Sequence, residues 1–181
     1  MAFTLQQYWD RRAASYEIHD VLGRSILKHY LEVLKPRSLV EVGCGRGELF
    51  PLYTGIPRVA ALDFSAKMLE YSQRRIDRHG LPIELHKMDI TGGCLAERFD
   101  VAATRTVLMH IHPDQIKAAA ENTGKMSDRL YLFEYWEENA GRLSPHNWLH
   151  DYVGLFTVLG YRLADSYSRS DVPQVLFMFE R

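Results

Sequence analysis

Residues 41–47 read Glu-Val-Gly-Cys-Gly-Arg-Gly, and this stretch decides the fold. It closes a short apolar run over 38–42 that predicts a buried strand. Glycines carry no β-carbon, so the backbone can turn sharply there and approach a ligand closely. A strand that leads directly into a glycine-rich loop and then into a helical segment is typical of a parallel α/β sheet.

The composition is that of an ordinary globular chain: 181 residues, 46% hydrophobic and 25% charged. This length predicts a single domain over 1–181. The formal net charge of -1 gives no general attraction for nucleic acid. Two cysteines, Cys44 and Cys94, exclude a disulfide framework. Because the chain has no apolar run of about 20 residues and no signal-peptide pattern, we expect a cytoplasmic protein without a membrane partner.

Short apolar runs alternate with helical segments around the loop, which predicts one mostly parallel sheet with helices on both faces. The last two strands are joined through 171–173, a connection too short for a crossover helix, so they should pair antiparallel. We expect strands over 38–42, 58–63, 82–87, 99–104, 129–136, 161–168 and 174–180. We expect helices over 5–34, between Ser65 and Gly80, over 113–122 with Gly124 beyond its end, and over 145–159 closed by Gly160.

Two aspartates follow neighbouring strands of the predicted sheet. Asp63 ends the second strand and Asp89 follows the third. Ligands of such sheets bind outside the carboxyl ends of the strands, where Asp63 could accept hydrogen bonds from ribose hydroxyls and Asp89 from an adenine amine. Taken singly, Asp63 could instead support the cap of the following helix, and Asp89 could be an ordinary turn residue. A dinucleotide fingerprint needs glycine where this chain has Glu48, so the loop suits a ligand without a pyrophosphate.

Taken in order, these motifs resemble those of class I S-adenosylmethionine-dependent methyltransferases. The resemblance rests on the loop 41–47, on Asp63 and Asp89, and on the Thr-Val-Leu-Met-His-Ile stretch over 106–111. The opening Tyr-Trp-Asp-Arg-Arg-Ala-Ala-Ser-Tyr over 8–16 is similar to the N-terminal helix that many members fold over the cofactor.

The resemblance implies a Rossmann-like three-layer sandwich of the α/β class. Its sheet would have seven strands, mostly parallel, in the order 3-2-1-4-5-7-6, with strand 7 antiparallel. Residues 1–36 would form a helical lid segment and residues 37–181 the core.

The resemblance also implies S-adenosyl-L-methionine as cofactor and S-adenosyl-L-homocysteine as product. It places the glycine loop beside the methionine part, Asp63 on the ribose and Asp89 near the adenine. Arg105 would line the region of the sulfonium, and Tyr16 would close the pocket. The residues implied to bind the cofactor are Tyr16, Glu41, Gly43, Cys44, Gly45, Gly47, Asp63, Phe64, Met68, Asp89, Ile90 and Arg105.

Methyl transfer from a sulfonium is an in-line displacement in which the protein mainly aligns the acceptor and excludes water. A general base is needed only when the acceptor arrives protonated. The candidates, after the fourth and fifth strands and on the predicted helix over 145–159, are His110, His112, Glu134, His146 and His150. Structural alternatives stand beside them: a histidine at position 110 is common in the family without being catalytic, and His112 could cap the following helix. His146 and His150, four apart on one helix, could simply lie at the edge of its apolar face.

Two closely spaced histidine pairs, His110 with His112 and His146 with His150, also suggest a zinc or iron site. The sequence places no carboxylate to complete such a shell, so we predict no metal. Aromatic residues near the same segments, Trp148 and Tyr152 among them, either wall an acceptor pocket or fill the core.

The acceptor is expected to be a small molecule methylated on oxygen or nitrogen. Members of the family that methylate amino groups of nucleic acids or glutamine carry an Asn/Asp-Pro-Pro-aromatic motif where this chain reads Thr-Arg-Thr-Val over 104–107. Neither cysteine follows a proline, as a cytosine C5 enzyme would require. Three alternatives stay open: cofactor cyclisation or cleavage, a non-catalytic member acting through a partner, and, as the weakest, a nicotinamide oxidoreductase. Monomer and homodimer are both compatible with the sequence.

Overall fold

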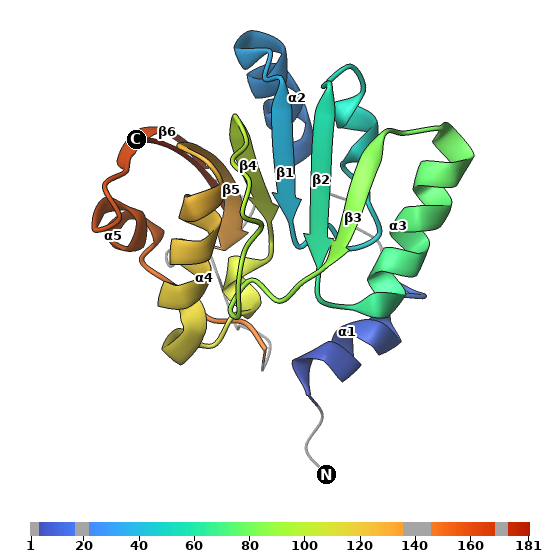
Figure 1. Cartoon of the computed structure of the whole chain (residues 1–181). Helices are drawn as coiled ribbons and strands as arrows, with labels where there is room; N and C mark the ends of the chain where they lie inside the picture. Colours follow the sequence, from blue (N-terminus) through green and yellow to red (C-terminus); the bar gives the residue numbers. More distant parts are fainter. Residues whose placement is uncertain (1–3, 17–21, 136–145, 169–173) are drawn as a thin grey trace.

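The computed structural model describes residues 4–16, 22–135, 146–168 and 174–181. It contains a seven-stranded sheet in the order β3-β2-β1-β4-β5-β7-β6 (Figure 1). Neighbouring strands pair in parallel except for β7, which runs antiparallel to both β5 and β6. The strand order and the antiparallel strand implied by the resemblance are therefore confirmed.

The strands are β1 (Ser38–Val42), β2 (Arg58–Asp63), β3 (Ile83–Lys87), β4 (Val101–Arg105), β5 (Arg129–Tyr135), β6 (Arg162–Ser168) and β7 (Gln174–Glu180). The helices are α1 (Leu5–Arg12), α2 (Leu22–Leu34), α3 (Ala66–His79), α4 (Pro113–Met126) and α5 (Tyr152–Thr157), with short 3-10 turns at Phe50–Tyr53 and Leu108–His110. Each expected strand is found within two residues of its expected ends, although Trp136 and the turn 171–173 lie outside the described residues.

Two apolar clusters separate the helical layers from the sheet. On one face, Leu27 and Leu31 of α2 and Ile76 of α3 pack against it. On the other face, Ile116 of α4 and Phe156 of α5 do the same. The sheet is thus the middle layer of a three-layer sandwich, and its two faces are the main core of the protein.

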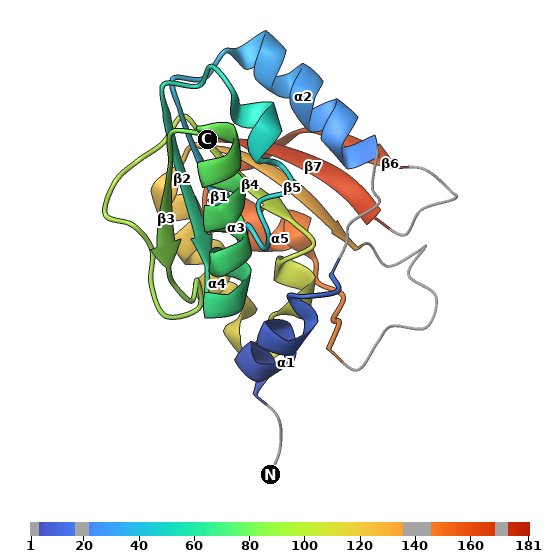
Figure 2. The same cartoon turned by 90° about the vertical axis from the view of Figure 1, so that its right-hand side faces the viewer.

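The expected single helix over 5–34 is wrong, because α1 and α2 are separate. Helix α1 starts at a capping box in which Thr4 and Gln7 satisfy each other's backbone N–H groups, and it ends at Arg12. None of its residues is buried. The apolar periodicity that predicted one long helix belongs to α2 alone, which lies on the sheet. As Figure 2 shows, α1 lies apart from α2 and near the opposite end of the strands.

Helix α4 is longer than expected, because Gly124 lies inside it rather than beyond its end. A β-carbon on Gly124 would stand 3.2 Å from the Tyr161 hydroxyl. Tyr161 lies within hydrogen-bond reach of the carbonyls of Gly124 and Ser127. The glycine therefore allows close packing of this tyrosine on α4 and does not stop the helix.

The expected helix over 145–159 is also wrong in most of its length. Residues 146–151 are not helical, and α5 begins only at Tyr152, after Asp151 accepts a hydrogen bond from the Gly154 N–H. Pro145, the expected first residue, lies outside the described part of the chain. His146 and His150 therefore do not share a helix.

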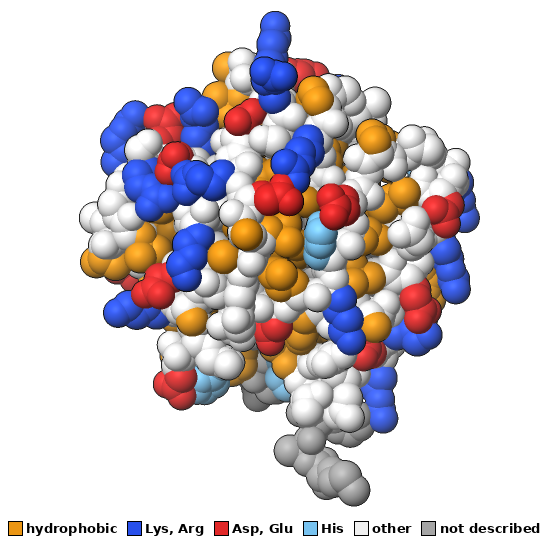
Figure 3. Space-filling view, viewed as in Figure 1, with side chains coloured by type: hydrophobic (Ala, Val, Ile, Leu, Met, Phe, Trp, Pro, Cys, Tyr) orange, Lys and Arg blue, Asp and Glu red, His pale blue; other side chains and the backbone are white. Residues whose placement is uncertain are grey.

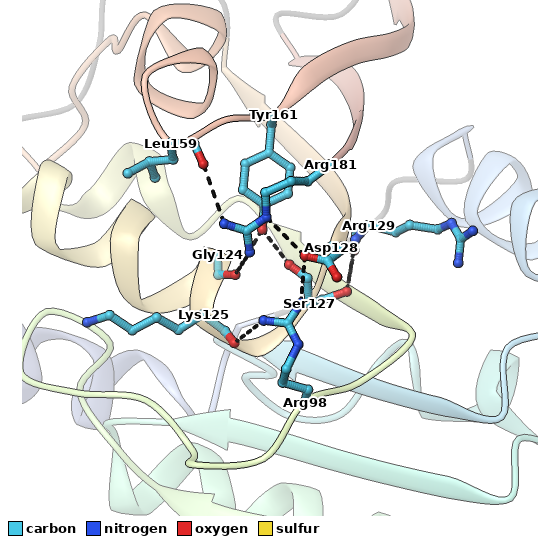
Figure 4. A network of polar contacts seen from close by, with 9 residues as sticks. All are labelled: Arg98, Gly124, Lys125, Ser127, Asp128, Arg129, Leu159, Tyr161 and Arg181. Atoms are coloured by element: carbon cyan, nitrogen blue, oxygen red, sulfur yellow. Dashed lines mark hydrogen bonds and ion pairs between the residues drawn. The ribbon is translucent and has the colours of Figure 1, made fainter.

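A polar network at the amino ends of β4 and β5 fastens the last residue of the chain (Figure 4). The Asp128 carboxylate forms ion pairs with the guanidinium groups of Arg98, at 2.6 Å, and Arg181, at 2.9 Å. Arg181 also donates to the Gly124 carbonyl at 2.9 Å and lies over the Tyr161 ring. This network lies at the amino ends of the strands, away from the loops that follow their carboxyl ends. It therefore stabilises the fold and leaves those loops free for a ligand.

The surface offers no single region of one charge on the face drawn in Figure 3, where acidic and basic side chains are interspersed. This agrees with the formal net charge of -1. Within the described residues, each helix is too short or too polar to span a lipid bilayer.

Candidate active site

A cavity of about 480 Å³ lies at the carboxyl ends of β1 to β4. Residues of α1 form part of its lining. In Figure 1, α1 lies below the arrowheads of β1, β2 and β3. The predicted site residues that line it are Tyr16, Glu41, Gly43, Cys44, Gly45, Asp63, Phe64, Met68, Asp89, Ile90, Arg105, His110 and His146. Three predicted residues are not part of the lining: Gly47, Glu134 and His150.

Asp63 joins the glycine loop to the start of α3. Its Oδ2 accepts a hydrogen bond from the Gly45 N–H at 2.8 Å, and its Oδ1 accepts one from the Ser65 N–H at 2.8 Å. Gly43 and Gly45 have φ angles of 71° and 56°, which glycine adopts without strain. Burial raises the pKa of Asp63 to about 6, although the backbone N–H groups act to lower it. This carboxylate therefore shapes the loop as well as lining the cavity.

Gly47 lies behind the loop. Its φ is 73°, and a β-carbon there would meet the Phe50 ring at 2.5 Å. Phe50 is fully buried, so the glycine makes room for this ring to pack beneath the loop. The structure gives Gly47 a supporting position, unlike Gly43 and Gly45.

Glu41 places a buried carboxyl group in the cavity wall. The side chain is almost fully buried, and its Oε2 has no hydrogen-bond partner among the described residues. Burial raises the pKa of Glu41 to about 8, against the lowering effects of the Tyr53 hydroxyl and the Arg105 guanidinium. At pH 7 this carboxyl group is mostly protonated when the site is empty. A cationic group of a ligand placed beside it would favour the charged carboxylate, so the position is well suited to receive such a group.

His110 is held in one tautomer. Its Nδ1 lies 3.0 Å from the His146 carbonyl oxygen, and a carbonyl can only accept, so Nδ1 carries the proton and Nε2 the lone pair. Burial lowers the pKa of His110, which outweighs the opposite effects of the His146 carbonyl and the Asn147 side chain. The edge of the Trp9 ring contacts the imidazole, with ring centroids 4.8 Å apart. The result is a neutral imidazole with one basic nitrogen.

Residues 146–150 run as a strap along the turn that carries His110. Beside the contact of His146 with His110, the Trp148 N–H donates to the Met109 carbonyl at 2.8 Å. His150 Nε2 donates to the Ile111 carbonyl at 3.0 Å. His150 is therefore an anchor of the strap that does not reach the cavity, and the structure does not support it as a base.

Glu134 is likewise positioned away from the cavity. It is fully buried, and its carboxylate accepts from the Thr104 hydroxyl at 2.8 Å and from the backbone N–H groups of Val107, Leu108 and Met109 at 3.1 to 3.2 Å. Burial raises the pKa of Glu134 to about 7, while these donors lower it. Glu134 thus lies outside the cavity lining, where it holds the turn after β4.

Helix α1 is fastened over the cavity by Asp10. Its Oδ1 accepts hydrogen bonds from the Ser65 hydroxyl and from the Lys67 N–H, at the amino end of α3. Trp9 packs edge-on against Tyr16 with centroids 5.2 Å apart. Of the expected lid segment, α1 covers the cavity, whereas α2 packs on the sheet.

Sequence reasoning did not assign Trp9, Val107 or Gln115 to the site, although all three line the cavity, as does the candidate His112. Trp9 stands in the aromatic opening motif, which was the available signal. His112 also caps α4, because its Nδ1 accepts a hydrogen bond from the Asp114 N–H at 3.3 Å. This is the structural alternative that the sequence offered for His112. Among the described residues, no three His, Cys, Asp or Glu side chains come together as a metal site would require.

Comparisons with known proteins agree with this geometry. Residues 39–126 match the family model of a methyltransferase domain. No curated protein matches the chain. The structure is similar to the N-methyltransferase NodS from Bradyrhizobium japonicum WM9 in complex with S-adenosyl-L-homocysteine, with 19% identity, a TM-score of 0.77 and 97% of each chain covered.

Two further solved structures share the fold. One is magnesium protoporphyrin IX methyltransferase from Synechocystis PCC 6803 with bound SAH, at 17% identity and a TM-score of 0.76, covering 96% of this chain and 93% of that one. The other is the DhpI–SAH complex, at 20% identity and a TM-score of 0.71, covering 97% of this chain and 94% of that one. Residues 39–126 are thus similar to a methyltransferase domain, and the strand order is that of the Rossmann-like methyltransferase fold.

Proposed function

We propose that the protein transfers a methyl group from S-adenosyl-L-methionine to an oxygen or nitrogen atom of a small-molecule acceptor. The observation that carries this proposal is one continuous cavity that joins the glycine loop and Glu41 to a neutral, oriented His110. Two similar structures are named as complexes with S-adenosyl-L-homocysteine (SAH), which supports the choice of cofactor.

The cofactor would lie along the loops after β1 to β4. Gly43 and Gly45 allow its amino-acid part to approach the backbone, and the partnerless Oε2 of Glu41 fits its ammonium group. Asp63 still has acceptor capacity for ribose hydroxyls beyond its two backbone hydrogen bonds. The adenine would lie between Asp89 and the side chains of Ile90 and the β2 loop. When bound, the cofactor supplies a methyl group on a positively charged sulfur.

His110 is the proposed general base. Its Nδ1–H is committed to the His146 carbonyl, so the basic Nε2 can take the proton of an acceptor hydroxyl or amine. Its burial and lowered pKa keep the ring neutral at pH 7. His146 lines the same cavity and orients His110 through its backbone, so we assign it a positioning role.

Calorimetric titration with S-adenosyl-L-methionine and with S-adenosyl-L-homocysteine tests the cofactor site. We expect micromolar binding of either. If the folded protein binds neither, the proposal is withdrawn, and a non-catalytic member acting through a partner becomes the better reading. Product analysis then separates the chemistry: S-adenosyl-L-homocysteine marks transfer, whereas methylthioadenosine marks cyclisation or cleavage of the cofactor.

His110→Gln tests the base once an acceptor is found, and His150→Gln is its matched control. Removing the base should lower kcat by about 100-fold or more while cofactor affinity stays within threefold. His150→Gln removes an imidazole that bonds the same turn from outside the cavity, so it should lower stability more than kcat. Equal losses of kcat in both variants would show that His110 acts only by supporting the turn.

A further inference from the structure

The lining of the cavity divides into two parts by charge. All of its Asp, Glu and Arg side chains come from the carboxyl ends of β1, β2 and β4 and from the loops after β1 and β3, the part assigned above to the cofactor: Glu41, Glu48, Asp63, Asp89 and Arg105. The other part, here called the neutral pocket, is formed by α1, the turn after β4, the start of α4 and the strap. Its lining residues are Thr4, Leu5, Gln6, Trp9, His110, Ile111, His112, Gln115, His146 and Trp148.

The described residues of the neutral pocket include no Asp, Glu, Lys or Arg side chain. A carboxylate, phosphate or ammonium group on an acceptor would lose hydration there without gaining a charged side chain of the pocket as a partner, which is costly. An uncharged molecule avoids this cost. Side-chain amides and hydroxyls, such as those of Gln6, Gln115 and Thr4, can still orient it through hydrogen bonds.

Flat rings dominate the walls of the neutral pocket. Trp9 is held edge-on between His110 and Tyr16, at centroid distances of 4.8 and 5.2 Å. On the strap, Trp148 contacts the His112 ring edge-on at 5.3 Å. Rings fixed in this way present rigid surfaces on which another planar ring stacks with little loss of conformational entropy.

We propose that the acceptor is an uncharged planar aromatic compound that binds in the neutral pocket and is methylated on a ring hydroxyl. This inference rests on the proposed function. A phenol oxygen becomes a strong nucleophile only as it loses its proton, and His110 Nε2 is the base available for that proton.

The atoms and electrons of the transfer balance. The phenol O–H proton goes to His110 Nε2, and the oxygen uses its electron pair to form the bond to the methyl carbon. The bond from that carbon to sulfur breaks, and its electron pair stays on sulfur, which becomes a neutral thioether. The imidazolium then returns its proton to solvent.

Three ligands that share one ring system test the charge selectivity: 2-naphthol, 2-naphthoate and 2-naphthylmethylammonium. Each is titrated calorimetrically into the protein saturated with S-adenosyl-L-homocysteine, so that no turnover is needed. We expect 2-naphthol to bind at least tenfold more tightly than either ion. Tighter or equal binding of an ion, or no binding of 2-naphthol, overturns the inference. If S-adenosyl-L-homocysteine itself does not bind, the proposed function fails and this inference fails with it.

Two variants locate the binding site. Trp148→Leu should weaken 2-naphthol at least fivefold, with the affinity for S-adenosyl-L-homocysteine within twofold of the parent. Gln115→Lys places a cation in the neutral pocket and should improve 2-naphthoate at least fivefold, whereas Gln115→Leu, of similar size and uncharged, should not. Leu163→Ala on the exposed strand β6 is the control that should change neither ligand. If Trp148→Leu and Gln115→Lys have no effect, 2-naphthol binds elsewhere.

Discussion

The Val107 side chain lies directly against Gly43, at a distance where a β-carbon on that glycine would overlap both Val107 methyl groups. The Val107 N–H in turn lies 3.1 Å from both carboxylate oxygens of Glu134. The end of β5 thus fixes the turn after β4, and that turn presses on the glycine loop after β1. Three strand ends are coupled through one buried carboxylate.

Gly43→Ala should destabilise the protein by about 3 kcal/mol or more, because it adds an overlap to the strain of a left-handed φ. Gly80→Ala is the matched control: Gly80 has a φ of 61°, and its β-carbon would meet nothing within 4 Å. It should cost only about 1–2 kcal/mol. Urea unfolding measures both. Adding Val107→Ala to Gly43→Ala should restore part of the loss, and an unchanged loss would contradict the contact.

Glu134→Gln should reduce the free energy of unfolding by about 2 kcal/mol or more, since an amide cannot accept from all four donors that surround the carboxylate. The turn that carries His110 should also loosen, so kcat should fall more than cofactor affinity. Thr104→Val removes only one of the four donors and should have a smaller effect on both. A variant with parental stability and a large loss of kcat would instead point to direct participation of Glu134 in the chemistry.

The sheet and the cofactor side of the site could be predicted from the sequence for a simple reason. Short apolar runs mark buried parallel strands, and the residues that follow each run must meet at one edge. Asp63 and Asp89 were located in this way, and both line the cavity. Local spacing was enough because each residue is attached to its own strand.

The side of the cavity proposed for the acceptor could not be predicted, because its geometry depends on contacts between distant residues. The 146–151 segment continues the apolar spacing of α5, yet its hydrogen bonds go to Met109 and Ile111, more than thirty residues away. His146 and His150 looked equivalent on a helix, and only this strap separates their roles. Glu134, similarly, looks like any strand-end carboxylate until the turn after β4 folds onto it.

Asp63→Ala should both weaken S-adenosyl-L-methionine at least tenfold and lower stability, because this carboxylate bonds the Gly45 and Ser65 N–H groups. Asp63→Asn keeps one carbonyl acceptor and should recover part of the stability. Calorimetry and urea unfolding separate the two effects. Parental affinity in a folded Asp63→Ala protein would remove the ribose assignment.

The apoprotein should become less stable as pH rises from about 5 to 8. Burial raises the pKa of Asp63 to about 6, of Glu134 to about 7 and of Glu41 to about 8. A carboxyl with a raised pKa binds its proton more tightly in the folded state, so its contribution is complete below the unfolded pKa and is lost as pH rises through the folded value. Urea midpoints at pH 5.5 and 8.0 measure this, and a midpoint that increases over the range would contradict it.

Binding of S-adenosyl-L-methionine should release a proton from Glu41 at pH 7. In the empty site the pKa of Glu41 is about 8, so the group is mostly protonated at that pH. A cation placed beside its partnerless Oε2 favours the charged form and lowers the pKa. Affinity should therefore rise with pH between about 6 and 8, by less than tenfold per pH unit, and then level off.

Calorimetry at pH 7 in phosphate and in Tris, two buffers with different ionisation enthalpies, detects the released proton as a difference in observed binding enthalpy. Glu41→Gln, which keeps the shape but has no proton to release, should lose most of this difference and the pH dependence of affinity. Any remainder belongs to the ammonium group of the ligand itself. If the parent and Glu41→Gln proteins show the same difference, Glu41 does not receive the cation, and the ammonium group must bind elsewhere along the loop.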